Sequence, residues 1–388
     1  MGLATNLSFA IAGSGLMFLA AFPANAASVT LSYDSSIGRP ADFSKGEFPG
    51  IPGTLAAPQG VTVQESTGNI FIANGRGIDR VEVFDSKGNY LKGIGGTGTG
   101  PGQFDEPAAL AFQPGTGNLY AGDVFNNRVN VFDPNGNFIK SIADGQFGGL
   151  IEGRPFFGPS SIAFDKQGFG YVGDYSNDRF LKFDSQGNVV GSIGTPGTDP
   201  GQFLGPSGLA ISPVSGNLVV ADQNNNRIQV LTPEGEAVTT FGTPGTIPGQ
   251  SAPGEFIQPI DVEVDEYDNI YVTDSVNSRV QVFDINGKFI SEFGEPSGGD
   301  LPQIGGPTPY GNPLVLEPGV FNWTAGSHYE DDKLYVGDFF QGRVQVLNVN
   351  RGAEPVPEPS SMLGLAALGG MTLGYKLKQG RKQKAVKV

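Results

Sequence analysis

Hydrophobic and polar positions alternate along short segments of the middle of the chain, and this alternation returns six times with the same landmarks. Each copy has an apolar stretch, an acidic or amide residue, a short polar loop, an arginine and a second alternating stretch. The arginines lie 48, 51, 48, 52 and 64 residues apart, at Arg80, Arg128, Arg179, Arg227, Arg279 and Arg343. Alternation with a period of two is typical of half-buried β-strands, and a unit recurring at this spacing indicates a repeat fold.

Each copy predicts four strands. The first strand follows a proline, namely Pro58, Pro107, Pro159, Pro206, Pro259 or Pro318. The second strand ends at the acidic position, the third begins at the arginine, and a glycine-containing turn such as residues 134–137 leads to the fourth. Such turns favour antiparallel hairpins. Six units of four antiparallel strands predict an all-β protein, a six-bladed β-propeller.

The sixth copy has no fourth strand of its own before the proline-containing segment at residues 355–359. Residues 28–33 (SVTLSY), near the opposite end of the chain, alternate like a strand. We expect this N-terminal segment to supply the missing outer strand and to close the last blade. Closure of this kind removes the open sheet edges that a propeller must avoid.

The repeated core, Asp-x-x-Asn-Asn/Ser-Arg-Val/Ile-Gln-Val-Phe, resembles the NHL repeat, and the resemblance covers roughly residues 50–350. It implies a six-bladed propeller of the NHL type. The first copy departs from the pattern in two ways. It has Asn74 where the other copies have Asp, and it carries one extra residue before Arg80.

The N-terminus has the features of a secretory signal. Residues 7–22 are apolar, and small residues at Ala24 and Ala26 follow them. This order predicts a signal peptide over residues 1–26, with cleavage after Ala26. Residues 1–6 contain no Lys or Arg, in contrast to the usual basic start, so a membrane anchor is the alternative.

The C-terminus resembles a PEP-CTERM sorting signal. Pro357, Glu358 and Pro359 precede the apolar residues 362–375, and six Lys or Arg lie in the last 13 residues. The chain therefore divides into a propeller (27–350), a linker (351–361) and an apolar segment with a basic tail (362–388). The resemblance implies recognition by an exosortase, transient membrane insertion through a transmembrane helix, and a final location in the cell envelope or outside the cell. Fourteen apolar residues are short for a permanent span, which needs about 17–25.

Charge and composition narrow the possible partners. The formal net charge is −15, and without the six basic residues of the tail the body carries 18 bases against 39 acids. Nucleic-acid binding needs a basic surface, so we expect no nucleic-acid partner. There is no cysteine, which excludes disulfides, thiolate metal sites and a cysteine nucleophile.

Ligand binding is expected on one face of the ring. Because the strands alternate in direction, the loop after strand two and the long connection to the next blade emerge together, and long loops on a rigid scaffold commonly carry binding sites. The candidate residues are the aromatic ones of this face: Phe125, Phe156, Phe157, Tyr175, Tyr310, Phe339 and Phe340. Aromatic rings among carboxylates suit a sugar or a peptide, so the expected ligand is an envelope polysaccharide or protein; packing between blades is the alternative.

The acidic and arginine positions of each copy form pairs. They are Asp123 and Arg128, Asp174 and Arg179, Asp222 and Arg227, Asp274 and Arg279, and Asp338 and Arg343. A single active site does not need five copies of one pair. We therefore expect a structural role, in which carboxylate–guanidinium bonds fix the loops.

The resemblance to NHL propellers also raises the possibility of enzymatic activity, because related propellers include metal-dependent lyases and lactonase-like proteins. A histidine-rich zinc site needs several histidines. This chain has one, His328, expected in an exposed turn of the sixth copy. We therefore predict a non-enzymatic protein without a cofactor. The alternative is a lactonase- or lyase-like hydrolase with a divalent cation near Asp261 in the central channel.

Overall fold

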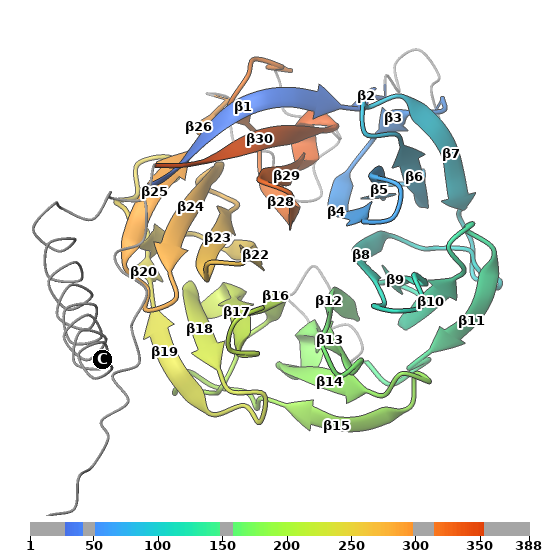
Figure 1. The fold of residues 1–388 in the computed structure, drawn as a ribbon, viewed down its shortest axis with the longest axis horizontal. Coiled ribbons are helices and arrows are strands. Elements are labelled where there is room, and N and C mark those ends of the chain that lie inside the picture. The colour runs from blue at the N-terminus through green and yellow to red at the C-terminus, as the bar shows by residue number, and fades with distance from the viewer. Residues whose placement is uncertain (1–27, 42–50, 148–157, 298–313, 353–388) are drawn as a thin grey trace, which may run out of the picture.

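Six four-stranded antiparallel sheets stand around a central axis in the computed structural model, which describes residues 28–41, 51–147, 158–297 and 314–352 (Figure 1). Each sheet is one blade, with its first strand innermost. The fold is therefore the predicted all-β, six-bladed propeller.

The first five blades have uninterrupted strand order. Blade one contains β4 (Pro58–Gln64), β5 (Asn69–Asn74), β6 (Arg80–Phe84) and β7 (Tyr90–Gly95). Blade two contains β8 (Pro107–Phe112), β9 (Leu119–Asp123), β10 (Arg128–Phe132) and β11 (Phe138–Ile142). Blade three contains β12 (Pro159–Phe164), β13 (Gly170–Asp174), β14 (Arg179–Phe183) and β15 (Val189–Ile193). Blade four contains β16 (Pro206–Ile211), β17 (Leu218–Asp222), β18 (Arg227–Leu231) and β19 (Ala237–Phe241). Blade five contains β22 (Pro259–Val264), β23 (Asn269–Asp274), β24 (Arg279–Asp284) and β25 (Phe289–Phe293).

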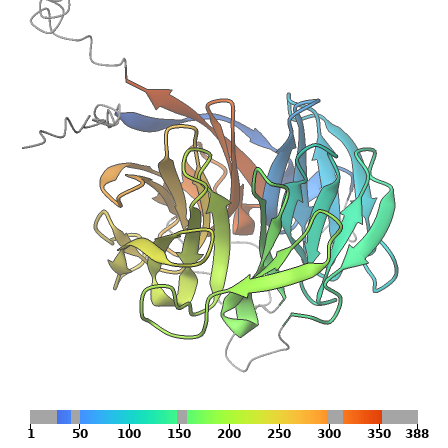
Figure 2. The same cartoon turned by 60° about the horizontal axis from the view of Figure 1, so that its bottom comes forward.

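Blade six joins the two ends of the propeller. Its strands are β28 (Thr324–Glu330), β29 (Lys333–Asp338), β30 (Arg343–Arg351) and β1 (Val29–Ile37). β1 runs antiparallel to β30 (Figure 2). The Gly352 N–H donates to the Ser28 carbonyl at 2.9 Å. The predicted closure by an N-terminal strand is confirmed.

One predicted strand start is wrong. The first strands of blades one to five begin at the predicted prolines, but β28 begins at Thr324 and Pro318 lies ahead of it. Pro318 instead opens a Pro-Gly-Val-Phe turn, equivalent to the Pro-Gly-Gln-Phe turns at 101–104 and 200–203. The sixth copy has Thr324 where the other copies have the proline, so the proline that precedes this strand in sequence belongs to the entering turn.

Five of the connections that enter a blade form short parallel contacts. Three are two-residue strand pairs: β2 (Arg39–Pro40) with β3 (Thr54–Leu55), β20 (Thr243–Pro244) with β21 (Glu255–Phe256), and β26 (Glu295–Pro296) with β27 (Val320–Phe321). Two more are single bridges, from Thr97 to Phe104 and from Pro196 to Phe203. The apolar residue at the end of each contact is fully buried: Leu55, Phe104, Phe203, Phe256 and Phe321. These side chains pack between blades.

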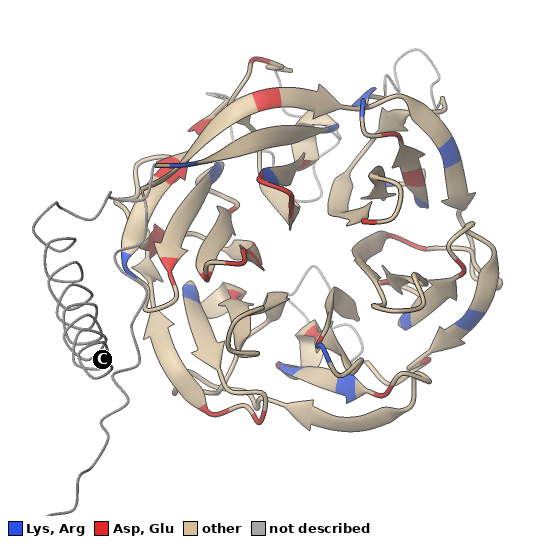
Figure 3. Cartoon of the chain, viewed as in Figure 1, with Lys and Arg blue, Asp and Glu red and all other residues tan. Residues whose placement is uncertain are grey.

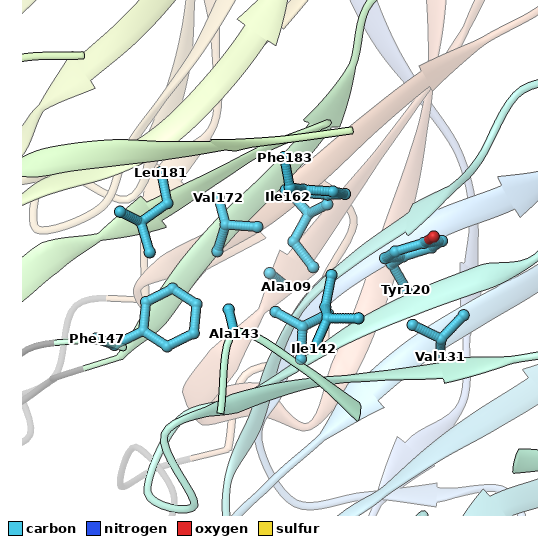
Figure 4. Packing of buried hydrophobic residues seen from close by; sticks show 11 residues of the cluster. Ala109, Tyr120, Val131, Ile142, Ala143, Phe147, Ile162, Val172, Leu181 and Phe183 are labelled. Carbon is cyan, nitrogen blue, oxygen red and sulfur yellow. The ribbon is translucent and has the colours of Figure 1, made fainter. Parts of the chain in front are cut away.

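The hydrophobic core is divided among the seams between neighbouring blades. The seam of blades two and three, for example, packs Tyr120 and Ile142 against Val172 and Phe183 (Figure 4). Equivalent clusters fill the other five seams. Each blade thus buries its apolar surface against its two neighbours.

The expected signal peptide and the expected PEP-CTERM sorting signal both lie outside the described residues. This applies to the signal peptide with Ala26, to the motif Pro357, Glu358 and Pro359, and to the apolar segment 362–375. Among the residues that the structure describes, no helix has the length and apolar character required to cross a membrane.

The closing strand provides a test of ring stability. Leu31 of β1 is 9% exposed and packs into the seam of blades five and six, whereas its neighbour Thr30 is exposed. We expect Leu31→Ala to lower the free energy of unfolding by about 2 kcal/mol, because it removes buried apolar volume. Urea denaturation measures this change. Thr30→Ala is the matched control, and an equal loss in both variants would contradict a sealing role for β1.

Candidate ligand-binding cavity at the long-loop face

The Asp/Arg pairs form the same contact in five of the six blades. The five predicted pairs are in contact, with Arg Nε between 2.7 and 3.0 Å from Asp Oδ2, and all five carboxylates are fully buried. The remaining guanidinium nitrogens of Arg279 donate to carbonyl oxygens of the entering connection, those of Ser251, Ala252 and Glu255, at 2.9 to 3.1 Å. The loop after strand two and the long connection are thereby held together on one face, which we call the long-loop face.

The second carboxylate oxygen completes this network. In blade four, Asp222 Oδ1 accepts the Leu204 N–H at 2.8 Å, just beyond the buried Phe203. Gln229 Nε2 donates both to Asp222 Oδ2, at 3.0 Å, and to the carbonyl of Gln202, at 2.7 Å. Burial raises the pKa of Asp222, while these hydrogen bonds favour its charged form. The pair therefore links strands two and three to the connection.

Blade one rearranges the same network. Asn74 takes the Asp position and its Oδ1 accepts the N–H groups of Ala56 and Ala57, at 2.8 and 3.2 Å. The carboxylate has moved to β6, where Glu82 accepts Arg80 Nε at 2.6 Å. This exchange accompanies the extra residue in the loop 75–79, which carries Arg76.

A cavity of about 140 Å³ lies on the propeller axis at the long-loop face. Loops after strand two contribute Arg76, Val124, Tyr175, Gln223, Phe339 and Phe340. Three of these loops contain a single turn of 3-10 helix, which brings its residues to the axis: η2 (Tyr175–Asn177), η3 (Gln223–Asn225) and η4 (Phe339–Gln341). The inner strands contribute polar residues, including Gln59, Ser160, Ser161, Ser207, Asp261 and Glu263.

One wall of the cavity is aromatic. The rings of Phe339 and Phe340 are 4.8 Å apart, and Trp323 meets Phe340 edge-on at 5.9 Å. The guanidinium carbon of Arg76 lies 5.0 and 4.9 Å from the two phenylalanine ring centroids. These are cation–π distances, so Arg76 of blade one is docked against blade six across the mouth of the cavity.

The residue before the first strand has an unusual backbone conformation in five blades, and in blades three and six this residue lines the cavity. In blades two to six this residue has positive φ, and three of the five are not glycine: Glu106 (62°), Gln258 (54°) and Trp323 (67°). Left-handed backbone at bulky residues costs energy and is concentrated at functional sites. Glu106 accepts the Arg76 N–H at 2.9 Å and a bond from Gln59 Nε2, and burial raises its pKa to about 7. Glu106 thus holds the Arg76 loop in place.

Two carboxyl groups project from β22 into the cavity. Asp261 Oδ2 accepts the backbone N–H of Ser327 at 2.6 Å and its hydroxyl at 3.1 Å. Burial raises the pKa of Asp261 to about 6. Burial, together with the charge of Asp261, raises the pKa of Glu263 well above its ordinary value. Among the described residues, no group of three His, Cys, Asp or Glu side chains is arranged to bind a metal ion.

His328 differs from its prediction. It lies within β28, paired with Tyr335, and its side chain is 22% exposed. The strand extends to Glu330, so the expected turn begins later. His328 Nδ1 is 3.9 Å from Glu263, and Nε2 is 3.8 Å from Glu330, in a second hollow of about 620 Å³ at the opposite end of the axis. Burial lowers the pKa of His328 to about 4.

Of the aromatic residues predicted to bind a ligand, some line the cavity, one does not, and the others are not described by the structure. Tyr175, Phe339 and Phe340 line the cavity, although each is less than one-tenth exposed. Phe125 is 39% exposed on the long-loop face and does not line the cavity. Phe156, Phe157 and Tyr310 lie outside the described residues. Sequence reasoning missed Arg76, Gln223 and Trp323, although the extra residue of the first copy marked the Arg76 loop.

The fold and the repeats define the class of protein: a six-bladed β-propeller that carries NHL repeats. The NHL repeat family matches residues 203–231 and 256–283, which are parts of blades four and five with their entering turns. A comparison with curated proteins finds no match to the sequence.

Solved structures share the fold at low identity. A protein of unknown function from Bacteroides thetaiotaomicron has a TM-score of 0.59 and 19% identity, over 83% of this chain and 76% of its own. A catalytically inactive virginiamycin B lyase from Staphylococcus aureus, solved with quinupristin, has a TM-score of 0.51 and 13% identity, over 83% of this chain and 100% of its own. A gluconolactonase from Xanthomonas campestris has a TM-score of 0.51 and 12% identity, over 85% of this chain and 98% of its own.

The Asp/Arg pairs differ in exposure, and this difference can be tested. The Arg279 side chain is 9% exposed and that of Arg179 is 35% exposed, while both partner carboxylates are fully buried. We expect Arg279→Met to lower the free energy of unfolding by about 3–5 kcal/mol, because it leaves a buried charge unpaired. Arg179→Met should cost less, because water can reach that pair. Chemical denaturation of both variants measures the order, and a reversed order would contradict the role of burial.

Proposed function

We propose that the protein is an exported, non-enzymatic binding propeller whose axial cavity holds a segment of an envelope polysaccharide. The observation that carries this proposal is the composition of the cavity. One wall is formed by Trp323, Phe339 and Phe340, and the rest is lined by serine, glutamine and carboxyl side chains. Sugars present apolar ring faces bounded by hydroxyl groups, so aromatic surfaces beside hydrogen-bonding groups suit them.

The rigidity of the site supports binding. Its lining residues come from all six blades, and the aromatic wall is fixed by ring contacts and by Arg76. A preformed cavity avoids the entropic cost of ordering loops when a ligand enters.

The destination of the protein is proposed from the sequence of its ends. The signal peptide over residues 1–26 would direct export. The PEP-CTERM segment would then direct insertion into the membrane and recognition by an exosortase. An exported protein with this destination meets the polysaccharides and proteins of the envelope.

A lactonase- or lyase-like activity is the second candidate, since the propellers that share the fold include a gluconolactonase and a virginiamycin B lyase. The carboxyl groups of Asp261 and Glu263 inside the cavity favour it, because their raised pKa values suit proton transfer. Turnover of a lactone, lost in Asp261→Asn, would replace the binding proposal with this one.

Binding can be assigned to the cavity with two matched phenylalanine variants. Phe339→Leu should weaken binding of polysaccharide extracted from the producing cells by about ten-fold, because an aromatic contact at the centre of a site is lost. Phe125→Leu makes the same change on the same face outside the cavity and should leave the affinity unchanged. Calorimetric titration measures both. Loss of binding only in Phe125→Leu would place the ligand on the outer loops.

Sorting can be tested in cells that contain an exosortase. We expect the chain to lose the residues that follow Pro359, and replacement of Pro357, Glu358 and Pro359 by alanine to abolish this processing. Mass spectrometry of the membrane and secreted fractions measures the C-terminus. Val356→Ala with Ser360→Ala is the flanking control. Identical processing in the motif variant would contradict the PEP-CTERM assignment.

A further inference from the structure

The two carboxyl groups of the cavity lack the arginine partner that the aspartates of the repeat have. The five fully buried aspartates of the repeat each contact an arginine, and so does Asp265, which Arg351 contacts at 2.9 Å. Within the described part of the chain, neither Asp261 nor Glu263 forms an ion pair with Lys or Arg. Both side chains are partly shielded from water, and a shielded carboxylate without a cationic partner is costly, so this position favours a cation supplied from outside.

The surroundings of these carboxyl groups are acidic overall. The ionisable groups that line the cavity are Asp261, Glu263, Arg76 and Tyr175. Arg76 comes from blade one and lies over the rings of Phe339 and Phe340. The nearest base to Glu263 is His328, at 3.9 Å, whose pKa is lowered by burial. Figure 3 shows acidic positions on β22, the innermost strand of blade five.

A second, independent group in the same cavity also has no partner. Ser161 on β12 is 7% exposed, lines the cavity, and its Oγ makes no hydrogen bond within the described structure. The other serines beside it are satisfied: Ser160 Oγ donates to the Pro206 carbonyl at 3.1 Å, and Ser207 Oγ to the Ile260 carbonyl at 2.7 Å. A buried hydroxyl without a partner indicates a missing hydrogen-bonding group.

Asp261 differs in kind from the residues at the same position of the other first strands. The equivalent positions on the other first strands carry only small residues: Gly60, Ala109, Ser161, Gly208 and Gly326. The three glycines among them allow the close approach of neighbouring strands; a Cβ on Gly60, for example, would lie 2.0 Å from the Ala108 carbonyl oxygen. Asp261 is therefore the one carboxyl group in a ring of small residues. Its position is specific to blade five and does not follow from the repeat.

We infer that the cavity recognises a protonated amine, and that its ligand is an amino sugar with a free amino group within the polysaccharide. This inference rests on the proposed function and names the chemistry of the recognised unit. The ammonium group would lie between Asp261 and Glu263, and a sugar hydroxyl would bond to Ser161 Oγ. The ring would face the wall of Trp323 and Phe339. Charge-assisted hydrogen bonds to both carboxylates give specificity for the amine over its neutral amide.

The test uses two oligosaccharides that differ only at nitrogen. Calorimetric titration of the full chain with a chitosan oligosaccharide should give binding about ten-fold or more tighter than with the same oligosaccharide fully N-acetylated. The double variant Asp261→Asn/Glu263→Gln should remove this preference. The double variant Glu234→Gln/Glu236→Gln, which makes the same charge change on an exposed turn, should keep it. A thermal melt of both variants confirms that each is folded.

Several results would overturn the inference. Equal affinity for the two oligosaccharides would show that the protein does not recognise the amine. A preference that survives in Asp261→Asn/Glu263→Gln would show that the amine is not recognised by these carboxyl groups. Calcium binding that depends on Asp261, without amine binding, would assign the carboxylates to a metal ion. Tighter binding of a lysine peptide would assign the cavity to a protein. Binding of other polysaccharide that depends on Phe339, with neither oligosaccharide bound, would refute the amine but keep the proposed function. Absence of all polysaccharide binding would refute both.

Discussion

Closure of the ring is the constraint on which the rest of the structure depends. No blade has a core of its own, because each buries its apolar side chains in the two seams that it shares with its neighbours. An open ring would expose two such apolar surfaces, one on each blade at the opening. β1 prevents this by pairing with β30 along its whole length, and Ile37 packs into the seam of blades six and one.

The Asp/Arg network fixes the loops of the closed ring on one face. In blades two, four, five and six, the pair joins strands two and three to the connection that enters the blade, through backbone groups whose position does not depend on side-chain identity. The connections can therefore vary in sequence and length without losing their attachment. This separation of a fixed frame from variable loops is what permits a binding site to develop on one face.

The sequence predicted what repeats and missed much of what does not. Strand alternation and the recurring Asp, Arg and Pro positions appear in several copies, so each copy supports the others, and the six blades follow from them. The cavity depends on single departures: the extra residue that brings in Arg76, the tryptophan at a position where blades three and four have glycine, and an aspartate among small residues. Pro318 was misplaced because the sixth copy has Thr324 at the position of the proline, and His328 was misplaced because β28 extends to Glu330. A departure from a repeat is visible in sequence, but the residues that it brings together come from different blades.

The direction of the last strand relates the cavity to the ends of the chain. β30 starts beside η4 on the long-loop face and runs to Arg351 at the opposite face, and β1 starts beside that end, where Val29 pairs with Arg351. Arg351 is fixed there by Asp265 and by the hydroxyl of Tyr329, at 2.9 and 2.7 Å. Residues 353–361 span about 30 Å even when extended. Until the expected cleavage after Pro359, a membrane segment beyond this linker would hold the propeller by the face opposite the cavity, and the cavity would open away from the membrane, toward the material that the proposed function requires it to bind.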